Sequence, residues 1–216
     1  RFPTGELAGH SLGNLIIAGL TEVTGNFGKA IQIAQELLEV HGSLYPSSLV
    51  PIILGARVGD RRVEGQVNIM HTRGIDSIYT DPDNPKVPNA VLRAIASAKT
   101  IVAGPGSLFT SVLAVLAVPA IRESINASSA KKIYVVNLKP QELETSGFDI
   151  SDHVKALVKH NFTPDLILAD DSFIAPGDAD RYCRSIQSEL VICPLANKFG
   201  ILHDPELLAD AFRKYA

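Results

Sequence analysis

Residues 100–111 read Thr100-Ile-Val-Ala-Gly-Pro-Gly-Ser-Leu-Phe-Thr-Ser111. A short apolar run ends in a Gly-Pro-Gly turn, and a second apolar segment with helical spacing follows at once. This order predicts a strand, a tight loop and the first turn of a helix. In an open α/β sheet, ligands bind beyond the carboxyl ends of the strands, so a binding site is expected at this loop.

The loop has a composition that suits a phosphate group. Its two glycines have no Cβ, so that backbone amides can approach a ligand closely. Hydroxyl groups follow on the first helical turn, where unpaired amides and a partial positive charge favour an anion. The predicted phosphate-binding residues are Gly104, Pro105, Gly106, Ser107 and Thr110. A plain Gly-Pro-Gly turn with Ser107 as a helix N-cap is the alternative interpretation.

Composition limits the classes of function. A chain of 216 residues, 46% hydrophobic and 20% charged, suits one core, and we expect a single domain over residues 1–216. The net charge of −3 gives no positive field for nucleic acid or an anionic membrane, so small molecules or proteins are the expected partners. The longest apolar run, residues 112–121, is interrupted by Pro119 and too short to cross a bilayer. Cys183 and Cys193 form no CxxC pair, which favours a reducing compartment.

Hydrophobic periodicity predicts an α/β fold. Short β-rich runs between residues 44 and 80, separated by Gly59-Asp60 and Arg73-Gly74, predict an antiparallel or mixed insert. From Pro88 onward, helical and strand patterns alternate, which implies parallel strands with right-handed crossovers. The predicted architecture is a Rossmann-like three-layer fold with a mainly parallel sheet and the β-rich insert.

Two further places carry candidate ligand residues. The apolar helix predicted for residues 11–23 has His10, Ser11 and Asn14 at its start, and we predict that they bind the ligand. Simple capping of that helix by Ser11 is the alternative. Asn137 ends the strand predicted for residues 132–138, where its amide is well placed for a ligand hydrogen bond. Glu144, in the loop that follows, is either a base or metal ligand or a solvated carboxylate.

Other pairs of functional residue types carry less weight. Asp170-Asp171 has the chemistry to hold Mg²⁺ against a diphosphate, but a solvated capping loop is the preferred interpretation. Asp152 and His153 are neighbours on a predicted helix and therefore point in different directions. No zinc signature or nucleophile motif is present in the sequence, so we predict no resident metal.

Three motifs, in this order, resemble the gluconeogenesis factor family, the regulatory relative of 2-phospho-L-lactate transferase in the CofD-like superfamily. They are Gly9-His-Ser-Leu-Gly-Asn-Leu15, Gly104-Pro-Gly-Ser-Leu-Phe-Thr-Ser111, and Asn137 to Thr145 followed by Asp152-His-Val154. The resemblance implies a Rossmann-like core that binds a nucleotide diphosphate, with a UDP-type sugar as the best candidate. It also implies a cytoplasmic bacterial protein that is required for growth on gluconeogenic carbon sources and for cell shape.

The sequence departs from the family in two places. Family members usually open with a Gly-Gly-Thr-Gly turn and an Asp-Asp-Gly-Gly-Ser stretch, and this sequence begins after both, so we expect weakened ligand binding if these residues are the whole chain. The phosphate loop of the transferase typically reads Gly-Pro-Ser-Asn-Pro, whereas residues 104–108 read Gly-Pro-Gly-Ser-Leu. The second departure favours a regulator over a transferase.

Three hypotheses follow. In the first, the chain is a regulator that binds a nucleotide sugar without turnover. In the second, it is a transferase that moves a phospholactyl group from a guanosine diphosphate donor to a deazaflavin, with Mg²⁺ neutralising the diphosphate. In the third, it is a scaffold that acts through protein contacts and forms a homodimer.

Overall fold

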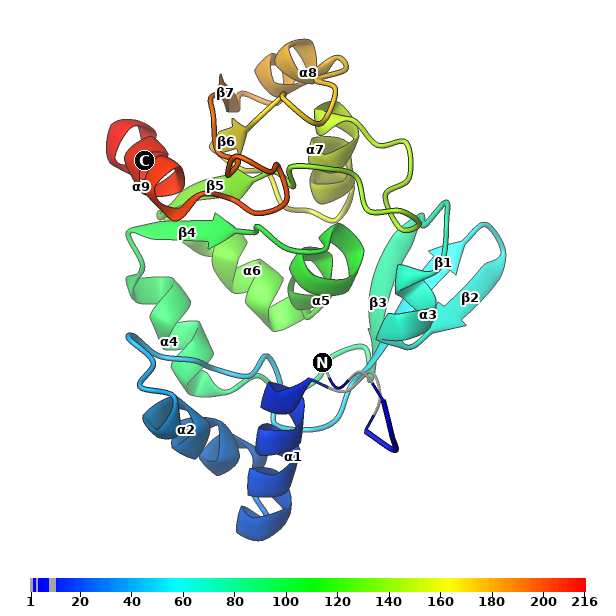
Figure 1. Ribbon diagram of the computed structural model, residues 1–216, viewed down its shortest axis with the longest axis vertical. Coiled ribbons are helices and arrows are strands. Elements are labelled where there is room, and N and C mark those ends of the chain that lie inside the picture. The colour runs from blue at the N-terminus through cyan, green and yellow to red at the C-terminus, as the bar shows by residue number, and fades with distance from the viewer. Residues whose placement is uncertain (1, 3, 8–10) are drawn as a thin grey trace. The chain divides into compact units, whose positions relative to one another are not determined.

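The structure, a computed structural model, describes Phe2, residues 4–7 and residues 11–216. The chain divides into two compact units, whose elements are labelled in Figure 1. Unit 1 comprises Arg1–Pro51 and Lys86–Val91, and unit 2 comprises Ile52–Pro85 and Leu92–Ala216. Each unit is described by itself.

Unit 1 contains two helices, α1 (Leu12–Thr24), where the sequence predicts a helix over residues 11–23, and α2 (Phe27–Leu37). The Ser11 hydroxyl caps α1, and Gly25 ends it in the left-handed conformation with φ of 61°. Asn26 then caps α2. The buried residues of α2 lie on one face of that helix, and α1 has no buried residue. The buried residues of α2 are Ala30, Ile31 and Ala34.

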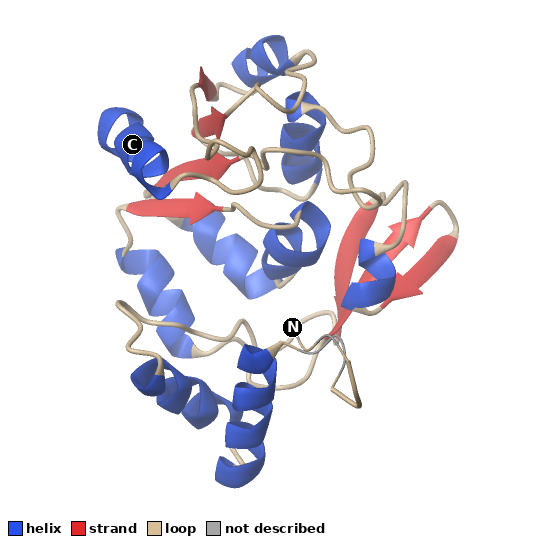
Figure 2. Ribbon diagram, viewed as in Figure 1, coloured by secondary structure: helices blue, strands red, loops and turns tan. Residues whose placement is uncertain are grey.

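Unit 2 contains an antiparallel sheet in the order β2-β1-β3. Its strands are β1 (Ile53–Val58), β2 (Arg61–Glu64) and β3 (Ser77–Asp81). The turn between β1 and β2 lies at Gly59, with φ of 55°, as the Gly59-Asp60 signal predicts. The predicted β-rich insert therefore exists as a three-stranded sheet, shown at the right of Figure 2.

Two details of the insert prediction are wrong. Residues Gln66–Met70 form helix α3, not the end of a strand, because Gly65 (φ 89°) breaks the extended chain after β2. Leu44-Tyr-Pro46 is not a strand either, since the backbone N–H and carbonyl of Leu44 bond to the Gln35 side chain and not to a neighbouring strand. In both places a short apolar run is compatible with more than one backbone conformation.

The second sheet of unit 2 is fully parallel. Its strands lie in the order β4-β5-β6-β7, which is also their order in the sequence. They are β4 (Thr100–Ala103), β5 (Lys131–Val135), β6 (Leu166–Ala169) and β7 (Glu189–Ile192). The parallel α/β architecture predicted from the alternating pattern is thus confirmed, and all four carboxyl ends lie along one edge.

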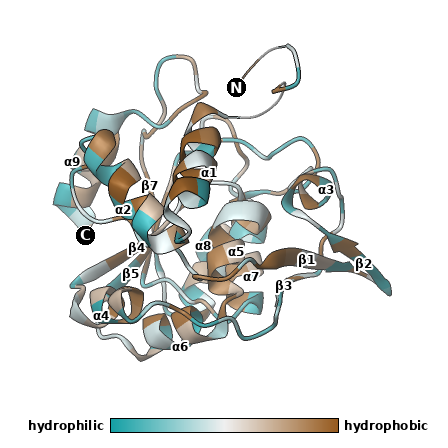
Figure 3. Ribbon diagram, turned by 90° about the horizontal axis from the view of Figure 1, so that it is seen from below, coloured by the Kyte–Doolittle hydropathy of each residue, from teal (hydrophilic) through white to brown (hydrophobic). Residues whose placement is uncertain are grey.

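Helices cover both faces of the parallel sheet. In Figure 3, α9 and α6 lie on opposite sides of β4 and β5. Ile133, Leu166 and Leu168 form a fully buried core that packs against Leu195 and Ala211, the latter on α9. The remaining helical segments are α4 (Asn89–Ser97), a π-helical turn η1 (Leu108–Val112), α5 (Leu113–Leu116), α6 (Pro119–Ala127), α7 (Ile150–Lys159), α8 (Ala179–Ser185) and α9 (Pro205–Tyr215).

None of the described helices is by itself long and apolar enough to cross a membrane. One consecutive pair, Leu108–Leu116 and Pro119–Ala127, is apolar enough over their combined length, with a bend of 74° between the two helices.

The start of α7 is fixed by a reciprocal cap. Asp149 Oδ1 accepts from the Asp152 amide at 2.8 Å, and Asp152 Oδ2 accepts from the Asp149 amide at 3.2 Å. Asp152 is therefore a capping residue.

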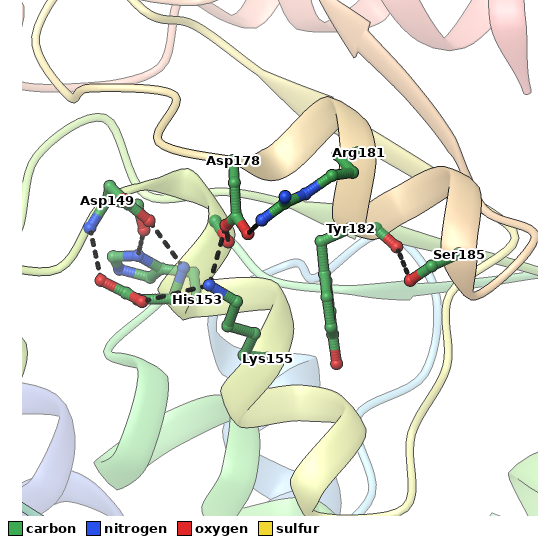
Figure 4. A network of polar contacts seen from close by, with 9 residues as sticks. Asp149, His153, Lys155, Asp178, Arg181, Tyr182 and Ser185 are labelled. Carbon is green, nitrogen blue, oxygen red and sulfur yellow. Dashed lines mark hydrogen bonds and ion pairs between the residues drawn. The ribbon is translucent and has the colours of Figure 1, made fainter.

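A second contact joins α7 to α8. Figure 4 shows that the Asp178 carboxylate, just before α8, forms ion pairs with Lys155 from α7 and Arg181 from α8. Hydrogen bonding from Lys155 holds the pKa of the Asp178 carboxyl well below its usual range.

Candidate functional site

The loop after β4 has a backbone that only glycine allows at its first position. Gly104 has φ of +80°, and a Cβ there would lie 2.7 Å from the carbonyl oxygen of Val135 on the neighbouring strand. The Gly104–Pro105 peptide bond is cis. The helical segment begins directly after Ser107, whose carbonyl accepts from the amides of Ser111 and Val112, both at 3.0 Å. The predicted sequence of strand, tight loop and helix is confirmed.

A cavity of about 660 Å³ opens at this loop. Three segments line it: the loop after β4, the loop after β5, and a segment that follows β7. The lining residues are Pro105, Gly106, Ser107, Asn137, Leu138, Lys139, Pro140, Gln141, Gly200, Ile201, Leu202 and His203. The cavity therefore lies at the carboxyl edge of the parallel sheet, where ligands of such folds bind.

The loop after β5 holds the loop after β4 by hydrogen bonds from side chains. Asn137 Oδ1 accepts from the Gly106 amide at 3.4 Å. Gln141 Nε2 donates to Ser107 Oγ at 2.7 Å. Ser107 Oγ is the acceptor in this bond, so its hydroxyl keeps its own proton to donate into the cavity. Gly106 and Ser107 are thus fixed in place before any ligand arrives.

A buried carboxylate lies beside the start of the helical segment. Glu144 is 2% exposed, and its Oε2 accepts from Thr110 Oγ1 at 3.1 Å. Burial raises the pKa of Glu144, while Thr110 and the amides of Phe109 and Leu108 partly offset the rise. The interpretation of Glu144 as a solvated carboxylate is wrong, because the helix start encloses it. Thr110 itself is 5% exposed and does not line the cavity.

Two further lining residues carry ionisable groups. His203 Nε2 lies 3.2 Å from the Val136 carbonyl oxygen, and because a carbonyl only accepts, that nitrogen carries the proton when the bond forms. Burial lowers the pKa of His203, which favours the neutral ring. The Lys139 ammonium lies 4.7 Å from the centre of the Phe173 ring. Within the described residues, no carboxylate lines the cavity.

The structure brings together part of the predicted site. Pro105, Gly106, Ser107 and Asn137 all line the cavity, and Gly104 precedes them at the end of β4. Thr110, also in unit 2, does not line it. Of the candidates near the start of the chain, the Ser11 hydroxyl accepts from the Asn14 amide at 3.2 Å, which is helix capping in unit 1, and His10 lies outside the described residues.

Sequence reasoning missed the third segment of the cavity wall. Residues 200–203 follow β7, and their position after a strand of the parallel sheet is the signal that was available. The loop over residues 170–177 does not line the cavity. Asp170, at the end of β6, instead anchors the segment after β7: its Oδ2 accepts from the amides of Leu195 at 2.7 Å and Ala196 at 2.9 Å. It is 4% exposed, so the expectation of a solvated loop is wrong there.

Metal-ligating residues do not gather in the described part of the chain, where no group of three or more His, Cys, Asp or Glu side chains is arranged to hold an ion. Asp170 also accepts from the Ser172 amide at 3.0 Å. Burial opposes the charged form of Asp170, but these hydrogen bonds prevail and hold its pKa below the usual value.

A parallel α/β sheet with a glycine-rich loop and a cavity at its carboxyl edge places the chain in the class of open-sheet α/β domains, whose ligands typically bind at that edge. The sequence profile of a family described as 2-phospho-L-lactate transferase CofD matches residues 1–195. A putative gluconeogenesis factor of Thermotoga maritima is 43% identical over 99% of this chain and 75% of its own length. The chain therefore belongs to the CofD family, among the gluconeogenesis factors.

Two other similarities define the extent of the match. A putative gluconeogenesis factor of Deinococcus radiodurans is 36% identical over 98% of this chain, which spans only 49% of that protein. A crystal structure of a UPF0052 family member from Bacillus halodurans aligns with a TM-score of 0.86 at 31% identity, over 98% of this chain and 75% of that one. The chain thus spans between half and three quarters of the length of these relatives.

Proposed function

We propose that the chain binds a nucleotide diphosphate sugar of the UDP type in the cavity and acts as a cytoplasmic regulator, required for growth on gluconeogenic carbon sources and for cell shape. The observation that carries the proposal is the convergence of Gly106, Ser107 and Asn137 on one cavity at the sheet edge. Its volume lies within the range of about 300–1,000 Å³ typical of small-molecule sites. The names of the related gluconeogenesis factors support the gluconeogenic part of this role.

Roles follow from the geometry. The Ser107 hydroxyl is free to donate to a phosphate oxygen because Gln141 supplies the hydrogen that Ser107 accepts. The Gly106 amide shares its proton with Asn137 over a long 3.4 Å contact, which a phosphate oxygen can replace. The Asn137 amide group then turns to the sugar or base. Binding of this kind positions a ligand without activating it.

A regulator is favoured over an enzyme by the chemistry of the cavity wall. The described lining residues include neither a carboxylate nor a thiol, and the neutral His203 ring is held by a backbone carbonyl. Ser107 has an amide as its partner, not a base that would activate it. This set of groups can hold an anion, and among the described lining residues the neutral His203 ring, through its Nδ1 lone pair, is the candidate for a general base.

The second candidate is a phospholactate transferase, which the family description favours. Such a reaction implies Mg²⁺ with the nucleotide diphosphate, and hard cations take carboxylate and other oxygen ligands. The described cavity wall offers hydroxyl, amide and carbonyl oxygens but no carboxylate, so it does not fit a cation held by the protein. We derive no step through this ion.

Isothermal titration of the full-length protein tests the proposal. UDP-N-acetylglucosamine and a guanosine diphosphate compound are titrated separately, each with and without Mg²⁺. Tight binding of the UDP-sugar that does not depend on Mg²⁺, without product formation, is the expected result. Preference for the guanosine compound, followed by GMP release when a deazaflavin is added, would identify an enzyme instead.

Gly106→Val locates the binding site. A Cβ at Gly106 would lie 3.4 Å from the Ser111 Cβ, an ordinary contact, so the fold should tolerate a side chain there that blocks the approach of a ligand. Gly19→Ala in α1 is the matched control, because a Cβ at Gly19 meets nothing within 4 Å. Loss of UDP-sugar binding in Gly106→Val alone is expected, and unchanged affinity would place the phosphate elsewhere.

A further inference from the structure

We infer that Lys139 selects an anionic ligand for the cavity, and that its ammonium leaves the Phe173 ring to bind phosphate oxygens. The inference rests on the proposed function, because it names the residue that recognises the charge of the same ligand. Lys139 stands two residues beyond Asn137, in the loop that also carries Gln141.

The charges of the cavity wall point to this residue. Among the described lining residues, Lys139 is the one with a permanent positive charge. Its ammonium forms no ion pair with any described carboxylate. A cavity with one uncompensated cation and no carboxylate in its described wall attracts anions and repels cations.

The Lys139 ammonium can leave its contact with the Phe173 ring. Lys139 is exposed, and its Nζ lies 4.7 Å from the Phe173 ring centre, a cation–π distance. Such contacts at exposed sites are weaker than a charge-assisted hydrogen bond to a phosphate. The flexible four-carbon stem of lysine allows the exchange of one partner for the other.

The ring that holds the ammonium also contacts the third segment of the cavity wall. Phe173 packs edge-on against Gly200, where a Cβ would lie 2.3 Å from the ring Cζ. Gly200 leads into Ile201 and Leu202, which line the cavity and are 73% and 66% exposed. The wall therefore offers an apolar surface beside the cation. The ligand class that fits is an organic phosphate with a flat, weakly polar group, such as a nucleotide.

Three substitutions in the full-length protein test the inference. Lys139→Met removes the charge and keeps the apolar stem, and Lys139→Arg keeps the charge. Lys198→Met is the matched control, since the Lys198 ammonium lies 4.9 Å from the Phe199 ring centre in a similar contact, and Lys198 does not line the cavity. The probes are UDP-N-acetylglucosamine, inorganic pyrophosphate and uridine.

Lys139→Met is expected to lower the affinity for the two phosphate-containing probes, UDP-N-acetylglucosamine and pyrophosphate, about tenfold or more, as the loss of a charged hydrogen-bond donor does. Uridine affinity should not change, and the affinities of Lys139→Arg and Lys198→Met should stay close to that of the wild type. The dependence of affinity on salt should also become shallower in Lys139→Met. Equal thermal midpoints for Lys139→Met and Lys198→Met exclude unfolding as the cause; if Lys139→Met unfolds, Lys139→Gln replaces it.

The outcomes separate the inference from the proposed function. Unchanged pyrophosphate and UDP-sugar affinity in Lys139→Met overturns the role of Lys139 and leaves the proposed function intact. Pyrophosphate binding that depends on Lys139, without UDP-sugar binding by the wild type, overturns the proposed function and supports the inference. If the wild type binds neither phosphorylated probe, both are overturned.

Discussion

Gly104 and Gly106 occupy the same loop under different constraints. Gly104 is held at φ of +80°, and a Cβ there would lie 2.7 Å from the Val135 carbonyl oxygen, whereas a Cβ at Gly106 makes an ordinary contact with Ser111. We expect Gly104→Ala to lower the free energy of unfolding by about 1–3 kcal/mol because the strained backbone has no relief. Gly106→Ala should change it by less than about 0.5 kcal/mol. Urea denaturation of the two variants measures the difference, and equal losses would contradict this assignment of roles.

Glu144 contributes through the hydrogen bond that it accepts from Thr110. Glu144→Ala leaves the buried Thr110 hydroxyl without a partner, so the free energy of unfolding should fall by about 1–3 kcal/mol. Glu144→Gln keeps an acceptor oxygen and removes a buried charge, so a smaller loss is expected, again by urea denaturation at neutral pH.

The pH dependence of the same comparison gives an independent check. Burial raises the pKa of Glu144 in the folded state, so the folded protein binds this proton more tightly than the unfolded chain does. The wild type should therefore gain stability relative to Glu144→Gln as pH falls toward about 4, the ordinary pKa of glutamate. If the wild type instead loses stability relative to Glu144→Gln as pH falls, the folded protein stabilises the charged form of the Glu144 carboxylate.

His160 joins α7 to the antiparallel sheet. Its Nδ1 lies 2.7 Å from the Ala156 carbonyl oxygen and must donate, while Nε2 accepts from the Ile78 amide at 3.1 Å. This arrangement needs the neutral ring, and burial lowers the pKa of His160. The contribution of the neutral His160 ring to the free energy of unfolding is therefore fully present above the pKa of the unfolded chain, about 6.5. It is lost as the pH falls through the lower pKa of the folded protein. Ring ¹⁵N shifts of His160 recorded from pH 7.5 to 5 should show this late protonation; titration near 6.5 would contradict it.

At the scale of elements, the antiparallel sheet depends on a glycine–tyrosine pair. Gly55 on β1 lies opposite Tyr79 on β3, and a Cβ at Gly55 would lie 2.2 Å from the tyrosine ring. Gly55→Val should displace the ring and lower hydrogen-exchange protection in β1 and β3, without a change in β5 and β6. The double variant with Tyr79→Ala removes the clash and should recover part of the loss. Equal loss in both sheets would mean that the sheets unfold together.

Elements bounded by turn signals could be predicted from the sequence. Residues 100–103 and 166–169 are short apolar runs that end at glycine or aspartate, and both form strands. Helix α6 begins at Pro119, whose fixed φ favours a first helical turn. The prediction was wrong at residues 66–70, where a five-residue apolar segment has no period long enough to separate helix from strand.

The candidate site was only partly predictable for a different reason. Gly106, Ser107 and Asn137 follow strands that the sequence reveals, so their convergence follows from topology. Lys139 shares the loop of Asn137, but its contact with Phe173 joins residues distant in the sequence, as does the anchoring by Asp170 of the segment that leads to His203. Contacts between residues distant in the sequence leave no local pattern to recognise.

At the scale of the whole molecule, the two units differ in how much of their structure is buried. No residue of α1 is buried, and Val23 is 85% exposed, whereas the residues of β6 are buried throughout. Opening energies in a protein follow such differences, so amides of α1 should exchange about a hundredfold or more faster than those of β5 and β6. Hydrogen exchange followed by NMR or mass spectrometry measures both in one sample, and equal protection would contradict the division of stability between the units.

Adding the UDP-sugar to the same exchange experiment tests the predicted ligand residues of unit 1. If His10, Ser11 and Asn14 bind the ligand as the sequence predicts, protection should rise in the first turn of α1 because a bound ligand opposes its opening. Protection that rises around Gly106 and Ser107 alone would leave Ser11 as the cap of α1, which is the contact its hydroxyl already makes. The experiment thus separates ligand binding from helix capping at a position where one serine is suited to both.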